Sequence, residues 1–292
     1  MQAIRSVHLA YFSGTGGTAR VAEEIEKAFL EKSIPARKSE LIRNAPVVHD
    51  EDLLVLLFAV YALRAPRPVD EWIEQAPPGN GRPAAVISVS AGGEISPNAN
   101  CRAAVIRQLE LKGYDVLYEG MFVMPCNFLI RYDDALCAML LKAAPRKANR
   151  IASDILAGTR CRKKPLLFDR LLSTIGLLEK RNSGFFGKHL YATEGCIGCG
   201  WCEKHCPRGN ISLHSGKPLF GAECVICLRC VYGCPQNAII PGFAKSFVLQ
   251  DGFNIQAIER RTSHLTQFPP LNQIAKGPIM AGVRRYLKEE LD

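Results

Sequence analysis

Two stretches of this chain have the same cysteine spacing: Cys196-Ile197-Gly198-Cys199-Gly200-Trp201-Cys202-Glu203-Lys204-His205-Cys206-Pro207 and Cys224-Val225-Ile226-Cys227-Leu228-Arg229-Cys230-Val231-Tyr232-Gly233-Cys234-Pro235. Each stretch reads C-x2-C-x2-C-x3-C-P. Three thiolates at this spacing can bind three irons of a cubane when the loop folds back on itself, and the fourth cysteine, on a short helix that leaves the loop, ligates the other repeat's cluster. The spacing therefore predicts two [4Fe–4S] clusters in a small α+β domain.

The pattern assigns four cysteines to each cluster. The first cluster is expected on Cys196, Cys199, Cys202 and Cys234, and the second on Cys224, Cys227, Cys230 and Cys206. Structural zinc is the alternative, but zinc sites usually combine two separated pairs and would leave the triplets and the Cys-Pro ends unexplained. A disulfide framework is disfavoured on the same spacing. The remaining cysteines, which show no further metal-site spacing, are interpreted as free thiols: Cys101, Cys126, Cys137 and Cys161.

The chain has 292 residues, of which 48% are hydrophobic, enough for a large core and two domains. Residues 1–9 lack the long apolar core and cleavage site of a signal peptide. The longest apolar run, Leu53 to Leu63, is too short to cross a bilayer. With eight cysteines assigned to iron, we expect a cytoplasmic protein in a reducing compartment.

The formal net charge of +9 is concentrated in one segment. Twelve lysines and arginines but only three acids lie between Lys142 and Lys188, so this segment accounts for the whole excess. Its basic residues lack interleaved aromatics or a known reading motif, which argues against a nucleic-acid partner. Two interpretations stay open, a solvated helix face and a docking surface for an acidic redox partner protein.

The first half of the chain alternates strand and helix signals, which favours a parallel α/β sheet. Strands are expected over residues 6–12, 36–42, 52–61, 84–90 and 116–124, and helices over 18–31, 69–75, 98–112 and 145–156. The run at 52–61 is apolar throughout, as expected for a central strand that is covered on both faces. Five strands with intervening helices predict a doubly wound parallel sheet.

These signals divide the chain into four parts. They are a sheet domain over 1–158, a basic connector over 159–189, an iron–sulfur domain over 190–242 and a tail over 243–292. Residues 166–178 of the connector are apolar enough for a helix. Because Asp169 and Arg170 interrupt the run, we expect this helix to pack on a domain, and contact with a membrane surface is disfavoured. No role for the tail follows from its residues.

A glycine-rich loop follows the first expected strand: Ser13-Gly14-Thr15-Gly16-Gly17-Thr18. Its position before a helix favours anion binding by backbone N–H groups. A nucleotide triphosphate loop would need Gly-Lys-Ser/Thr, and the lysine is missing. A dinucleotide fingerprint is met by Gly14, Gly16 and Ala19, but Glu40 is only a loose candidate for its ribose-binding acid. Hydroxyls at 13, 15 and 18 favour a third interpretation, a cradle for the terminal phosphate of FMN.

This loop resembles the flavodoxin phosphate loop, and with the cysteine repeats behind it the chain is similar to bacterial and archaeal flavodoxin–ferredoxin fusion proteins. The resemblance covers residues 5 to 242 and implies a flavodoxin-like sheet domain that binds FMN, followed by a 2[4Fe-4S] ferredoxin-like domain. It also implies that the loops after the third and fourth strands flank the isoalloxazine ring. Those loops consist of Val60, Tyr61, Ala62, Leu63 and Arg64, and of Ser90, Ala91, Gly92 and Gly93.

Several residues of these loops have two interpretations. Tyr61 is either a ring that stacks on the flavin or a core residue, and Arg64 either faces the flavin N1–C2 edge or is a solvated surface residue. The second loop offers no aromatic partner, which leaves one face of the ring open. Cys126 and Phe128 end the fifth strand on the same edge, where they either line the pocket or pack in the core.

These features predict an electron-transfer protein that relays electrons between FMN and two [4Fe–4S] clusters and to a redox partner protein, with no catalytic residue assigned. One alternative is a ferredoxin-linked FMN reductase that acts on a small substrate. Another is a flavin-free scaffold domain attached to an active ferredoxin unit. A flavin absorption shape is expected in the isolated protein, and its absence would favour the scaffold. Turnover of a small acceptor without a partner protein would favour the reductase.

Overall fold

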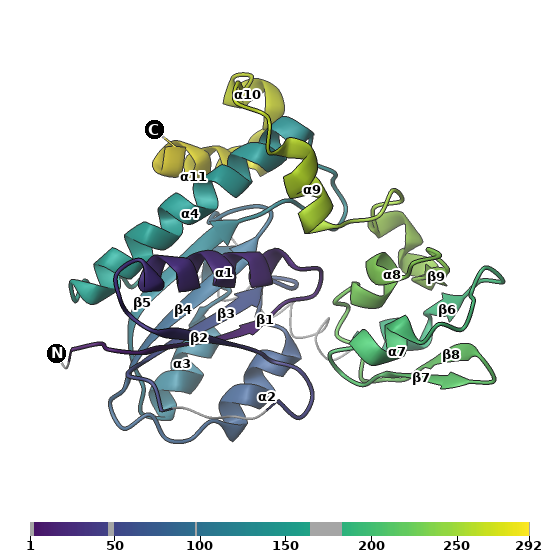
Figure 1. Ribbon diagram of the computed structural model, residues 1–292, viewed down its shortest axis with the longest axis horizontal. Coiled ribbons are helices and arrows are strands. Elements are labelled where there is room, and N and C mark those ends of the chain that lie inside the picture. The colour runs from purple at the N-terminus through teal and green to yellow at the C-terminus, as the bar shows by residue number, and fades with distance from the viewer. Residues whose placement is uncertain (1–2, 46–49, 97, 164–182, 292) are drawn as a thin grey trace.

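The computed structural model describes residues 3–45, 50–96, 98–163 and 183–291. Its N-terminal part contains a five-stranded sheet in the order β2-β1-β3-β4-β5, in which all neighbouring strands are parallel (Figure 1). The strands are β1 (Val7–Phe12), β2 (Ala36–Glu40), β3 (Leu53–Ala59), β4 (Pro83–Ser90) and β5 (Asp115–Val123). This strand order is that of the flavodoxin-like doubly wound fold, so the predicted fold class is confirmed.

Helices cover both faces of the sheet. They are α1 (Gly17–Leu30) and α4 (Asp134–Leu156) on one face, and α2 (Arg67–Gln75) and α3 (Ala103–Leu111) on the other, with a short 3-10 turn, η1 (Asn98–Asn100), before α3. Because side chains alternate along a strand, β3 supplies Leu53, Val55 and Leu57 to the α1/α4 core and Leu54, Leu56 and Phe58 to the α2/α3 core. Burial on both faces explains why β3 is apolar along its whole length.

Helix α4 begins eleven residues before the expected start at 145, so the predicted boundary was wrong. The cause is the cap at Asp133, whose carboxylate accepts a hydrogen bond from the backbone N–H of Leu136 at 2.7 Å. Pro145 therefore lies inside the helix and not in its first turn. A proline there removes one helical N–H donor, a cost that the burial of residues on both sides of it offsets.

The cysteine-rich part forms a small module beside the sheet domain (Figure 1). Its elements are β6 (Tyr191–Ala192), α7 (Trp201–His205), β7 (Ile211–His214), β8 (Lys217–Phe220), α8 (Arg229–Gly233) and β9 (Ile239–Ile240). Strand β6 pairs with β9 and β7 pairs with β8, both antiparallel. Each short helix contains the third cysteine of a repeat and ends directly before the fourth, so the fourth cysteine caps the helix on which the spacing had placed it.

The tail, to which the sequence alone assigned no role, packs on the sheet domain. It forms η2 (Gly242–Phe247), α9 (Ile255–Thr262), α10 (Leu271–Ile274), η3 (Pro278–Met280) and α11 (Ala281–Leu291). Buried residues of α9 and α11, such as Ile258 and Leu287, belong to the α1/α4 core. Glu290 is buried and binds Lys147 of α4 through a 2.8 Å contact between Oε1 and Nζ. The tail therefore completes the core of the N-terminal domain.

The start of the connector is attached to the sheet. The N–H of Cys161 donates to the carbonyl of Leu117 at 3.0 Å, and the N–H of Glu119 donates to the carbonyl of Cys161 at 2.9 Å. The apolar helix expected over 166–178 lies outside the described residues. Within the described part of the chain, no helix is both long enough and apolar enough to span a bilayer.

Candidate electron-transfer centre

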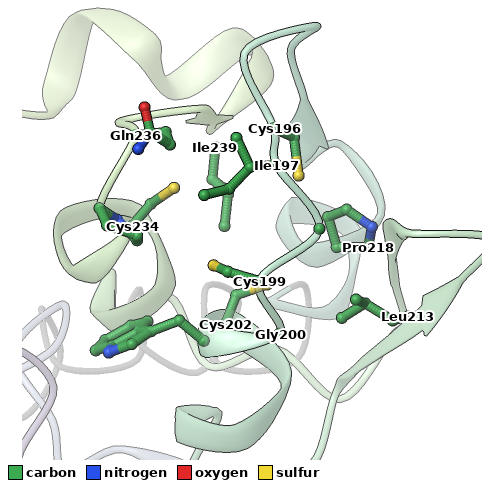
Figure 2. Close-up of a pocket in the computed structure, with 13 residues that line it drawn as sticks. Cys196, Ile197, Cys199, Gly200, Cys202, Leu213, Pro218, Cys234, Gln236 and Ile239 are labelled. Carbon is green, nitrogen blue, oxygen red and sulfur yellow. The ribbon is translucent and has the colours of Figure 1, made fainter.

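The four cysteines assigned to the first cluster surround one cavity. Figure 2 shows Cys196, Cys199, Cys202 and Cys234 around a central space, with Ile197, Pro218 and Ile239 among the apolar residues that line it. Cys234 comes from the second repeat, and its position opposite the first three follows from the contact between α7 and α8. The structure therefore brings together the ligand set that the spacing predicts.

The second set surrounds another cavity in the same way. Cys224, Cys227 and Cys230 line it together with Cys206 from the first repeat, and Phe186, Leu190 and Val231 supply apolar walls. Burial raises the pKa of the Cys227 thiol to about 12, and burial also raises the pKa of Cys230. A thiol in such surroundings becomes a thiolate when a metal binds it, because the metal's charge replaces solvation by water.

Both cysteine loops follow the same backbone path. The second and fourth residues after the first cysteine have positive φ in each repeat, at 66° and 74° for Gly198 and Gly200 and at 56° and 58° for Ile226 and Leu228. This conformation turns the loop back on itself so that three sulfurs face inward. It is strained for a β-branched residue such as Ile226, and strain of this kind is found at functional sites.

The sulfur arrangement also bears on the zinc alternative. Across the described ranges, no three His, Cys, Asp or Glu side chains converge closely enough to hold a single metal ion. Zinc would need four donors within about 2.3 Å of one point. Each cysteine set instead lines a cavity.

The glycine loop between β1 and α1 is shaped as an anion cradle. Helix α1 begins at Gly17, its N-cap Gly16 is left-handed at φ 95°, and its first turn contains no acidic residue. The hydroxyl of Ser13 accepts a hydrogen bond from the N–H of Ala19 at 3.2 Å, which leaves its proton to donate. The hydroxyl of Thr15 lies 2.7 Å from Nδ2 of Asn127. A helix N-terminus with these hydroxyls attracts a phosphate group.

One atom of this loop shows that a phosphate acceptor fits. The side-chain oxygen of Thr18 is buried, yet among the described residues it has no hydrogen-bond partner. A buried hydroxyl without a partner loses about 1–3 kcal/mol relative to a paired one. A phosphate oxygen at the N-terminal end of α1 would accept a hydrogen bond from the Thr18 hydroxyl, so the residues present fit the phosphate of FMN.

The loop after β3 forms a tight turn with two strained residues. The N–H of Tyr61 donates to the carbonyl of Arg64, and the N–H of Arg64 donates back to the carbonyl of Tyr61, both at 2.9 Å. The central residues Ala62 and Leu63 have φ of 40° and 67°. Positive φ at both central positions defines a type I′ turn, which usually contains Asn or Gly. Ala and Leu at these positions add strain at the predicted ring-binding edge.

The aromatic ring of Tyr61 is directed toward the phosphate loop. It contacts Phe12 edge-on with ring centroids 6.3 Å apart, and its hydroxyl would lie 2.7 Å from a Cβ placed on Gly14. Tyr61 thus packs against β1 and the phosphate loop, and its stacking on a flavin ring stays a prediction.

The loop after β4 is held by a hydroxyl and by the tail. The hydroxyl of Ser90 accepts from the N–H of Gly93 at 3.0 Å and from Nδ2 of Asn98 at 2.9 Å. Gly93 packs directly on the backbone of Gly282 in α11, where no side chain would fit at either glycine. Cys126 and Phe128 lie near this edge, and the Cys126 thiol donates to the Phe128 carbonyl at 2.8 Å.

A buried charge network supports the end of this loop. Arg102 is fully buried, and its guanidinium donates to Glu119 at 2.8 Å, to the hydroxyl of Ser88 at 2.9 Å and to Glu94. Sequence reasoning missed these residues, because an arginine at the start of α3 has no pattern that marks it as buried. Through Arg102, Glu94, which directly follows Gly93, is connected to Ser88 of β4 and Glu119 of β5.

The second cysteine loop lies against the phosphate loop. The guanidinium of Arg229, between Cys227 and Cys230, donates to the carbonyl of Gly14 at 3.1 Å and also to the carbonyl of Ser13 and the carboxylate of Glu40. A Cβ on Gly14 would overlap the carbonyl oxygen of Cys227. Glu40, the loose candidate for ribose binding, is therefore paired with the cysteine-rich module.

The basic residues at 142–163 are engaged within the chain. Two of them donate to backbone carbonyls of the tail, Lys142 to Leu265 and Arg146 to Glu290 and Leu291. The others form ion pairs: Lys147 and Arg150 with the carboxylate of Glu290, Arg160 with Asp115, Arg162 with Glu110, and Lys163 with Glu94. Docking of an acidic partner on segment 142–188 stays a prediction.

Comparison with known proteins identifies the cysteine-rich module. The 4Fe-4S binding domain family (Fer4) matches residues 191–212. A 46-residue stretch is 48% identical to one subunit of the ion-translocating oxidoreductase complex of Methanosarcina acetivorans, a match that spans 15% of this chain and 17% of that protein.

Solved flavodoxin structures are similar to the first half of the fold. A flavodoxin of Streptococcus pneumonia TIGR4 gives a TM-score of 0.40 at 13% identity, over 52% of this chain and 98% of its own. The two-electron reduced flavodoxin of Megasphaera elsdenii gives 0.34 at 20% identity, over 39% and 84%. With the strand order observed here, the chain consists of a flavodoxin-like domain followed by a ferredoxin domain, the architecture of a flavodoxin–ferredoxin fusion.

Proposed function

We propose that this chain is an electron-transfer protein that relays electrons between FMN and two [4Fe–4S] clusters and exchanges them with a redox partner protein. The observation that carries the proposal is the contact between the two sites, in which the Cys227 loop lies directly on Gly14 of the phosphate loop. When bound, FMN exchanges two electrons per molecule, whereas each cluster exchanges one.

The protein's own residues supply binding and position. Hydroxyls of Ser13, Thr15 and Thr18 and the N-terminus of α1 would hold the phosphate, and the turn at 61–64 and the loop at 90–93 would flank the ring. The two cysteine sets would hold the irons. Because eight of the twelve cysteines would bind iron, we place the protein in a reducing compartment such as the cytoplasm.

An anaerobic reductive titration tests this function. Protein that carries one FMN and two clusters takes up about four electrons per chain, two on the flavin and one on each cluster. Uptake of two electrons with no flavin absorption would instead support the scaffold, in which only the ferredoxin unit is active.

One cavity favours the reductase as a second candidate. It has a volume of about 220 Å³ and is lined by Arg131, Tyr132, Tyr232, Asp251 and Arg261, among others. The Tyr132 hydroxyl donates to the carbonyl of Ala91 in the 90–93 loop at 2.7 Å, so the cavity adjoins the predicted ring site. Turnover of a small acceptor by the protein alone would support this function.

A further inference from the structure

The two cysteine loops are repeats, so equivalent positions can be compared directly. Ile197 and Val225 both follow the first cysteine of a repeat, yet Ile197 is 66% exposed and Val225 only 5%. The next cysteines differ in the same way, since Cys199 is exposed and Cys227 is buried. The first loop therefore faces solvent and the second does not.

The second loop is covered by the flavodoxin-like domain. Val225 and Cys227 belong to the same core cluster as Phe12, and Tyr61 packs against that cluster. Arg229 fixes the loop to the carbonyls of Ser13 and Gly14, as described above. The cluster site held by this loop is consequently the one next to the phosphate loop.

The first loop makes its contacts within the module. Trp201, the equivalent of Arg229, stacks on His205 with ring centroids 4.2 Å apart and covers Gly233, where a Cβ would overlap the indole ring. Gly198 packs on Gly216 in the turn between β7 and β8. At equivalent positions, Arg229 attaches the second loop to the neighbouring domain, whereas Trp201 packs within the module and leaves the first loop at the surface.

We infer that the 196–202 loop is the port at which an external one-electron carrier reaches this chain, and that the 224–230 loop faces inward to the FMN site. The inference rests on the proposed function and adds to it the order in which the two cluster sites lie between the external carrier and the FMN site. When the chain is reduced through the port, the external carrier loses one electron, the cluster held by Cys196, Cys199, Cys202 and Cys234 gains it, and no bond forms or breaks; oxidation through the port is the reverse. That cluster returns to its oxidised state when the electron passes to the inner cluster.

Charge substitutions at Ile197 test the port on the full holoprotein. The probe is the methyl viologen radical cation, and the readout is bleaching of the iron–sulfur absorbance in a stopped-flow instrument. Ile197→Glu is expected to accelerate the reaction and Ile197→Lys to slow it, with a roughly fivefold spread at low ionic strength that shrinks with added salt. Leu111 is 78% exposed and is the last residue of α3, a helix that lies away from the module in Figure 1. It provides the control pair Leu111→Glu and Leu111→Lys, for which we expect equal rates.

A second measurement uses the wild-type protein and requires no variant to fold. Pulsed EPR of the reduced protein in D2O should show one cluster with strong and one with weak deuterium modulation. Equal rates for the two Ile197 variants, or equal modulation of the two clusters, would overturn the order. Because both readouts use iron–sulfur signals, they decide the port even if flavin analysis shows that the proposed function fails.

Discussion

Replacement of Thr18 by valine should change stability and flavin binding in opposite directions. The Thr18 hydroxyl is buried without a partner among the described residues, so Thr18→Val removes an unsatisfied polar atom and keeps the side-chain shape. Removal of such a group stabilises a protein by about 1–3 kcal/mol. In the same variant FMN loses a hydrogen bond to a charged phosphate, worth about 1.5–3 kcal/mol, and this weakens binding roughly 10- to 150-fold.

Both effects are measured on flavin-stripped protein under anaerobic conditions, by thermal unfolding and by fluorescence titration with FMN. The melting temperature should rise by roughly 2–8 °C while the dissociation constant of FMN increases. Thr15→Val is the matched control for the stability effect alone, because the Thr15 hydroxyl is already bonded to Asn127 and its loss should lower stability by about 1 kcal/mol. A lower melting temperature for Thr18→Val, or unchanged FMN affinity, would refute the phosphate cradle.

Three further changes follow from the packing. Gly14→Ala should cost about 1–3 kcal/mol of stability and displace the Cys227 loop, which an altered EPR spectrum of the cluster would show. Gly17→Ala is the control and should be tolerated, because the atom nearest to a Cβ placed on Gly17 is Cβ of Met124, 4.0 Å away. Glu290→Ala should cost about 3–5 kcal/mol by chemical denaturation, because it leaves the Lys147 cation buried and unpaired, while the exposed Glu289→Ala should change stability by less than about 0.5 kcal/mol. Burial lowers the pKa of Lys147, so the folded state binds the ammonium proton of Lys147 less well than the unfolded state. The loss of stability in Glu290→Gln relative to the wild type should therefore shrink as the pH rises from neutral toward the unfolded-state pKa of about 10.4. A deficit that does not change with pH would show that Lys147 stays charged in the variant.

Local patterns in the sequence predicted the sheet and the cysteine sets. The apolar run of β3 and the glycine loop before α1 are signals carried by adjacent residues, and they mark elements that the structure contains. The start of α4 was missed because Pro145 is a strong N-terminal signal and outweighed the weaker cap at Asp133.

Contacts between distant segments could not be predicted in the same way. The apolar faces of α9 and α11 require a partner, but nothing in their sequence says that the partner is α4. The contact of Arg229 with Gly14 joins residues that are 215 positions apart, and an arginine between two cysteines has the same pattern whether it is exposed or bound. The order of the two cluster sites is therefore a property of the folded chain alone.

Iron, acid-labile sulfide and zinc analysis of anaerobically purified protein, combined with EPR of the reduced sample, tests the central claim most directly. We predict about eight irons and eight sulfides per chain, with spectra of two [4Fe–4S] clusters that interact magnetically. About four irons per chain, or zinc in place of iron with a colourless protein, would contradict the assignment of the two cysteine sets.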